Sequence, residues 1–161
     1  MVMLTAFKGN NNSSKLLLDK VNSGNITKKL LTNSFDGCER ELLRYINIYN
    51  PEYIISFGRK PLINKLYIET SACCDDLCIS TNFDISFLKK SLQGADLSFA
   101  FSDKAGNYLC NYVYYKGLEF LKQSNSKAKM IFIHVPDMKR FQNLDVVALW
   151  LNDFCEALRR T

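Results

Sequence analysis

Short apolar runs alternate with stretches of helical spacing along most of this chain, and this alternation constrains its fold more than any other feature. Runs rich in β-branched and aromatic residues predict strands. The expected strands are 2–7, 26–31, 53–57, 65–69, 97–101 and 130–135. The expected helices between and after them are 14–21, 36–49, 84–92, 106–123 and 144–160.

The order of these elements is βαβαβ, then further strands with a helix, and then βαβα. Such an order is typical of a parallel sheet whose crossover helices cover both faces. We therefore expect an α/β fold, a three-layer α/β/α sandwich around a mostly parallel twisted sheet. A length of 161 residues suits one domain, so we expect residues 1–161 to form a single domain without a linker.

Composition and charge narrow the class of protein. The net charge is +5, but the lysines are spread along the whole sequence, so we expect no nucleic-acid partner. No stretch reaches the roughly 18 consecutive apolar residues of a membrane span. The N-terminus also lacks the basic and apolar regions of a secretory signal. We therefore expect a cytoplasmic protein with no membrane partner.

The six cysteines are expected to be reduced thiols, because disulfide frameworks belong mainly to short secreted chains. Segment 73–78 gathers three cysteines and two aspartates. Its spacing matches no standard zinc motif, so we expect neither a metal nor a cofactor. Cys38 and Cys155 lie in predicted amphipathic helices and are interpreted as core residues.

Cys110 lies near the start of the expected helix 106–123, after a turn through Ala105 and Gly106. The positive end of a helix dipole lowers the pKa of a nearby thiol and so favours its nucleophilic form. A lone cysteine in a helix is more often a buried structural residue. Cys110 is nevertheless the candidate nucleophile, because other chemistry-bearing residues occupy comparable positions.

His134 is the only histidine of the chain and lies at the end of an expected strand, with Pro136 restricting the backbone beyond it. We expect its imidazole to emerge at the tip of the strand and to act as a base toward Cys110. Glu69 ends another expected strand and would orient that imidazole. The alternatives are a hydrogen-bonded structural histidine and a solvated carboxylate. The carboxyl ends of parallel strands share one edge of a sheet, so we expect the three residues to gather there.

Longer motifs surround these residues. Residues 102–111 read Ser-Asp-Lys-Ala-Gly-Asn-Tyr-Leu-Cys-Asn, and residues 132–136 read Phe-Ile-His-Val-Pro. Both resemble motifs of the pyroglutamyl peptidase I (pyrrolidone-carboxylate peptidase) family of cysteine peptidases, and their separation (134 − 110 = 24) fits that family. Glu69 follows Gly58 at about the offset of the family's glutamate, and the end of strand 2–7 resembles the family's threonine-glycine-phenylalanine.

The resemblance implies a cysteine hydrolase that removes N-terminal pyroglutamate from peptides. Cys110, His134 and Glu69 would form its catalytic triad, and Phe7 would help to enclose the substrate ring. The implied partner is a peptide with a blocked N-terminus. Family members often assemble as oligomers, so the resemblance also implies a homo-oligomer.

The chain also departs from the family pattern. The loop after Phe7 is shorter and lacks a second aromatic residue, and Ile79 stands about where the family has an active-site arginine. These departures leave two alternatives open. One is a catalytically weak or inactive relative that acts as a binding or scaffold protein. The other is a cysteine amidase that acts on another lactam or amide.

Overall fold

The computed structural model describes residues 1–161 and contains every helix and strand expected from the sequence, with ends that shift by a few residues. The strands are β1 (Val2–Phe7), β2 (Ile26–Leu31), β3 (Tyr53–Lys60), β4 (Leu66–Glu69), β5 (Ser71–Cys74), β6 (Leu77–Ser80), β7 (Phe99–Ser102) and β8 (Lys129–Pro136). The helices are α1 (Ser13–Lys20), α2 (Phe35–Tyr49), α3 (Ile85–Gly94), α4 (Leu109–Gln123) and α5 (Leu144–Leu158).

Six strands form the central sheet in the order β2-β1-β3-β8-β4-β7. All neighbouring pairs are parallel except β4 and β8, which are antiparallel. The expected mostly parallel α/β sheet is therefore confirmed. The exception matters for function, because it reverses the direction of β4 and β7 relative to the other four strands.

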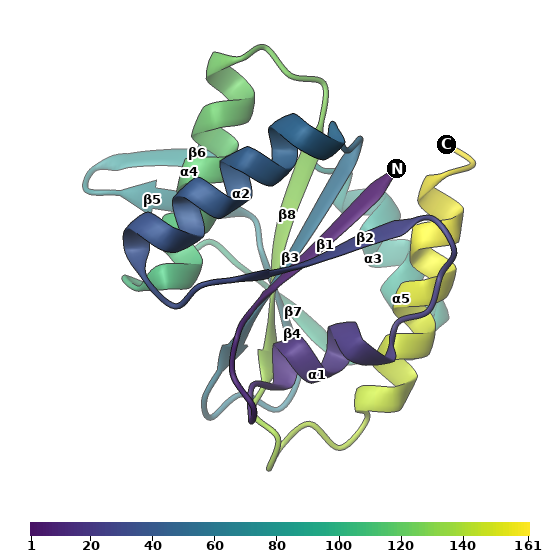
Figure 1. The fold of residues 1–161 in the computed structure, drawn as a ribbon. Helices are drawn as coiled ribbons and strands as arrows, with labels where there is room; N and C mark the ends of the chain where they lie inside the picture. Colours follow the sequence, from purple (N-terminus) through teal and green to yellow (C-terminus); the bar gives the residue numbers. More distant parts are fainter.

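Helices cover both faces of the sheet and enclose two apolar cores (Figure 1). The first core lies under α1, α3 and α5, and the second under α2 and α4. Strand β8 contributes to both, with Ile131 and Ile133 in the first core and Met130 and Phe132 in the second. Successive strand residues point to opposite faces, so one continuous apolar strand serves two cores.

Helix α2 illustrates how the local sequence produces these layers. Ser34 accepts a hydrogen bond from the Gly37 N–H (3.1 Å) and caps the first turn, and Asn50 ends the helix in the left-handed conformation (φ 42°). One face buries Cys38, Leu42 and other apolar residues, while the opposite face is charged. Cys38 is fully buried, as is Cys155 in α5, which confirms that both are core residues.

The sequence did not predict strands β5 and β6, which form a separate antiparallel hairpin beside α4. The register places Cys73 opposite Cys78, with Cα atoms 4.1 Å apart, and the two are joined by a disulfide. The expectation that all six cysteines are reduced is therefore wrong. Its physical reason is that directly paired residues of a hairpin bring their side chains within bonding reach.

None of the five helices combines the length and the apolar character needed to cross a membrane.

Gly117 sets the close approach of α4 to its neighbours. A Cβ at this position would lie 2.5 Å from Met130 Sδ and 3.1 Å from Leu42 Cδ2. We expect Gly117→Val to lower the free energy of unfolding by about 1–3 kcal/mol, because the buried side chains of Met130 and Leu42 would have to repack around the new atoms. Urea unfolding measures this. The matched control is Gly94→Val at the end of α3, where an added Cβ meets nothing within 4 Å. Equal losses in the two variants would contradict this packing argument.

Candidate active site

The connections of the sheet create a crevice at the carboxyl ends of β1 and β3. Strand β1 lies between β2 and β3, and the helix that follows it, α1, packs in the first core. Helix α2 leads from β2 to β3 and packs in the second core, on the opposite face. The chain therefore crosses from β1 to β2 over one face of the sheet and returns from β2 to β3 over the other face. The strand order reverses between β1 and β3, and open α/β sheets bind ligands at such a switch point.

A cleft of about 270 Å³ lies at this edge and brings together residues from five segments. Phe7 ends β1, Arg59 lies near the end of β3, and Cys110 is the second residue of α4. Two residues singled out from the sequence, Phe7 and Cys110, therefore line one cleft. The complete lining is Phe7, Asn12, Asn33, Arg59, Pro61, Tyr108, Leu109 and Cys110.

The other two candidate residues form a buried pair. His134 Nδ1 lies 2.7 Å from Glu69 Oε1, and the side chains are 4% and 0% exposed. A carboxylate oxygen accepts from an imidazole N–H, so this contact assigns the proton of a neutral ring to Nδ1 and leaves Nε2 as the acceptor. Tyr114 also donates a hydrogen bond to the Glu69 carbonyl (2.9 Å). Glu69 Oε2 has no hydrogen-bond partner.

The pair forms for a different reason from the one expected. Strand β4 is antiparallel to β8, so its carboxyl end does not lie at the edge where β1, β3 and β8 end. Glu69 instead pairs with Phe132, and His134 lies two residues further along β8 on the same face. The expectation that the imidazole emerges at a strand tip is also wrong, because His134 is 3% exposed within β8.

Cys110 approaches this pair over Gly58. A Cβ at Gly58 would lie 2.5 Å from Cys110 Sγ and 2.9 Å from Phe132 Cζ, so the thiol rests against the glycine. Gly58 is the register partner of His134 across β3 and β8. Neighbouring strands lie about 4.8 Å apart, which places the thiol beside the strand position of the imidazole. No hydrogen bond joins the thiol to the imidazole.

The electrostatics of Cys110 differ from the expectation. Burial raises the pKa of the thiol to about 12, and the charge of Glu69 acts in the same direction. The Lys60 ammonium and a backbone hydrogen bond lower the pKa, but burial outweighs them. The expectation of a lowered pKa is therefore wrong for the free protein. The thiol stays neutral, and its activation requires a base that removes the proton during attack.

The first turn of α4 supplies unpaired donors next to Cys110. Tyr108 caps this helix without a side-chain hydrogen bond. The first N–H groups of a helix have no acceptor within the helix. These groups can stabilise an oxygen that becomes negatively charged when the thiol attacks a carbonyl.

Several residues of the cleft were not predicted from the sequence, including Arg59, Asn12 and Tyr108. The position of Arg59 after Gly58, close to a strand end, is the signal that could have identified it. Ile79, which stands about where the family has an arginine, lies in β6 and does not line the cleft. No group of three or more His, Cys, Asp or Glu side chains could hold a metal ion.

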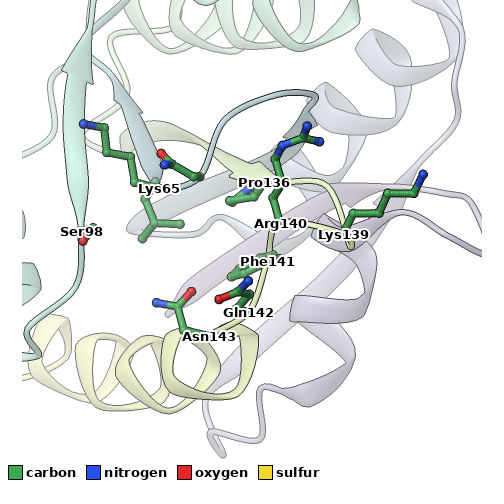
Figure 2. Close-up of a pocket in the computed structure, with 10 residues that line it drawn as sticks. Lys65, Ser98, Pro136, Lys139, Arg140, Phe141, Gln142 and Asn143 are labelled. Carbon is green, nitrogen blue, oxygen red and sulfur yellow. The ribbon is translucent and has the colours of Figure 1, made fainter.

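A larger cavity of about 470 Å³ lies between the starts of β4 and α5 (Figure 2). It lacks a thiol or an imidazole. The charged ends of Lys65, Lys139 and Arg140 point away from one another in Figure 2, and Arg140 pairs with Asp137 (3.1 Å). The smaller cleft is therefore the better candidate active site. The lining of the larger cavity is Asn64, Lys65, Leu66, Ser98, Pro136, Lys139, Arg140, Phe141, Gln142 and Asn143.

Comparison with known proteins gives a consistent set of relatives. The family model for pyroglutamyl peptidase matches residues 77–148. The pyrrolidone-carboxylate peptidase of Thermococcus litoralis is 29% identical over 118 residues, which cover 60% of this chain and 54% of the relative. That of Thermosipho melanesiensis is 27% identical over 144 residues, covering 76% and 71%. Human pyroglutamyl-peptidase 1 is 27% identical over 106 residues, covering 63% and 48%. The match thus spans about half the length of the Thermococcus and human relatives.

Solved structures show the same fold. The structure of pyrrolidone carboxyl peptidase from Thermococcus litoralis superposes with a TM-score of 0.81 at 22% identity, covering 96% of this chain and 91% of that one. Pyroglutamyl peptidase I from Bacillus amyloliquefaciens superposes with a TM-score of 0.82 at 18% identity, covering 93% and 90%.

The raised pKa of Cys110 predicts the pH dependence of its alkylation. Only the thiolate reacts, and its fraction rises about tenfold per pH unit below the pKa. We therefore expect the rate of Cys110 alkylation by iodoacetamide, followed by peptide mass spectrometry, to keep rising up to about pH 10. A short cysteine peptide levels off above its pKa of about 8.5 and serves as the reference. A plateau at neutral pH would mean that the resting thiol is already ionised, contrary to this geometry.

The contact between Gly58 and Cys110 predicts a coupling between the two positions. We expect Gly58→Ala to lower the free energy of unfolding by about 1–3 kcal/mol, because the new methyl group collides with Cys110 Sγ. In a Cys110→Ala background the same substitution should cost less, because one of the colliding atoms is gone. Urea unfolding of the four proteins measures the coupling. Identical costs in both backgrounds would rule out the contact.

Proposed function

The family match, the curated relatives and the solved structures all point to the pyroglutamyl peptidase I family, and on that premise we propose that this chain removes N-terminal pyroglutamate from peptides as a cysteine peptidase. The observation that carries the proposal is the buried hydrogen bond between Glu69 and His134, next to the cleft of Cys110. The partner is a peptide with a blocked N-terminus.

In this mechanism Cys110 Sγ attacks the carbonyl carbon of the pyroglutamyl residue while His134 Nε2 takes the thiol proton. The tetrahedral intermediate collapses to a thioester, and the imidazolium returns the proton to the leaving amine. Water, deprotonated by the same imidazole, then attacks the thioester and releases pyroglutamate. Removing the proton during attack suits a thiol whose pKa burial raises to about 12.

Glu69 acts on His134 and not on the substrate. Its carboxylate holds the imidazole in the tautomer whose Nε2 is free, and it stabilises the imidazolium that forms after proton transfer. The pair is fully enclosed, so the charge on Glu69 is poorly screened by solvent and its effect on the imidazole is large.

The lining of the cleft supports this choice of substrate. Its apolar walls, Phe7, Tyr108 and Leu109, can enclose a small lactam ring, and the amides of Asn12 and Asn33 can hydrogen-bond to it. The N–H groups at the start of α4 would stabilise the oxyanion. A cleft of about 270 Å³ suits a short substrate better than an extended chain.

A second candidate function is a catalytically inactive relative that binds peptides without cleaving them. Two observations favour it: burial raises the pKa of Cys110, and no hydrogen bond joins the thiol to the imidazole. A cysteine amidase for another lactam would use the same residues and differ in the walls of the cleft.

A fluorogenic pyroglutamyl amide tests the proposal. We expect the wild type to release the fluorophore and Cys110→Ala to release none. Glu69→Gln should lower kcat by about 100-fold or more with little change in KM, because the imidazole loses its orienting charge. Cys74→Ala removes an exposed thiol and serves as the matched control. Release that persists in Cys110→Ala, or no release by the wild type at high enzyme concentration, would overturn the proposal.

A further inference from the structure

Arg59 brings a free positive charge to the cleft of Cys110. It follows Gly58, against which the Cys110 thiol rests, and it is one of the residues that line the same cleft. Its guanidinium makes no ion pair with the protein, whereas Arg140 pairs with Asp137 and Arg159 with Glu156. A guanidinium that lines a cleft without a carboxylate partner is available to a ligand.

The rest of the cleft reinforces this charge. None of the eight lining residues is acidic. Asn12 is the N-cap of α1 and accepts a hydrogen bond from the Ser14 N–H. The first turn of this helix contains no acidic residue, so no side-chain charge offsets its positive end. The cleft therefore favours an anion next to the nucleophile.

The pyroglutamyl residue cannot supply this anion, because its lactam ring is neutral and its α-carbonyl is the group that the thiol attacks. The residue after the scissile bond can. In a pyroglutamyl dipeptide the terminal carboxylate carbon is two bonds, about 2.5 Å, from the scissile nitrogen. In a longer peptide the same position holds a neutral amide.

We propose that Arg59 determines the specificity of this site by pairing with a carboxylate on the residue after the scissile bond, so that pyroglutamyl dipeptides are the preferred substrate class. The inference rests on the proposed function and narrows it. The guanidinium and a carboxylate form two parallel charge-assisted hydrogen bonds, and this geometry discriminates against an amide.

Three substrates separate the sources of the carboxylate: pyroglutamyl-alanine, pyroglutamyl-alanine amide and pyroglutamyl-aspartate amide. We expect the wild type to prefer pyroglutamyl-alanine over its amide by about tenfold in kcat/KM, mostly through KM. A comparable preference for pyroglutamyl-aspartate amide over pyroglutamyl-alanine amide would show that a side-chain carboxylate can also pair with Arg59. Equal rates on all three substrates would overturn the inference and leave the peptidase proposal intact.

Variants test whether Arg59 carries the preference. In Arg59→Gln the ratio between the acid and the amide should fall to about one, and Arg59→Lys should keep part of it, because lysine retains the charge without the fork. Arg40→Gln, which removes the same charge from an exposed position on α2, should leave the ratio unchanged. An unchanged ratio in Arg59→Gln would overturn the assignment.

A binding measurement keeps the inference testable without turnover. Calorimetry on Cys110→Ala should show tighter binding of pyroglutamyl-alanine than of its amide, and adding Arg59→Gln should abolish the difference. If the wild type cleaves neither compound but Cys110→Ala shows this selectivity, the peptidase proposal fails and the role of Arg59 stands. Equal affinity for both compounds, or binding of neither, would overturn the role of Arg59.

Discussion

The pairing of β8 with two different neighbours is the constraint on which the candidate site depends. On one side β8 is parallel to β3, and this register places His134 opposite Gly58. On the other side it is antiparallel to β4, and this register places Glu69 opposite Phe132. Alternate residues of a strand share a face, so the two registers together bring Glu69, His134 and Gly58 to the same side of the sheet. The Cys110 thiol rests on Gly58 on that side.

The buried pair of Glu69 and His134 has an energetic cost that the fold must offset. A carboxylate taken out of water is strongly destabilising unless it is paired, and Glu69 Oε2 has no partner. A purely structural position would be more stable with an apolar side chain. A site that uses the charge of Glu69 to hold and stabilise an imidazolium gives the cost of burying this carboxylate a functional reason.

The thiol and the arginine of the candidate site differ in their exposure to solvent. Burial raises the pKa of Cys110, because a thiolate loses its hydration in the interior. Arg59, which lines the same cleft, is exposed to solvent. A substrate that brings its own carboxylate would pair with this exposed guanidinium, while the reacting carbonyl meets a buried, neutral thiol.

The sequence by itself determined the alternation of strands and helices, the layers they form and the position of Cys110 at the start of α4, because these follow from local periodicity and turn residues. Its motifs also predicted Cys110, His134 and Glu69 as the candidate catalytic residues. Only the tertiary structure decided the antiparallel direction of β4, the disulfide between Cys73 and Cys78, and the presence of Arg59 in the cleft. Strand direction and cleft lining depend on contacts between residues far apart in the chain, and no local pattern encodes them. The burial that raises the pKa of Cys110 arises in the same way, from side chains that pack around the helix start after the sheet has formed.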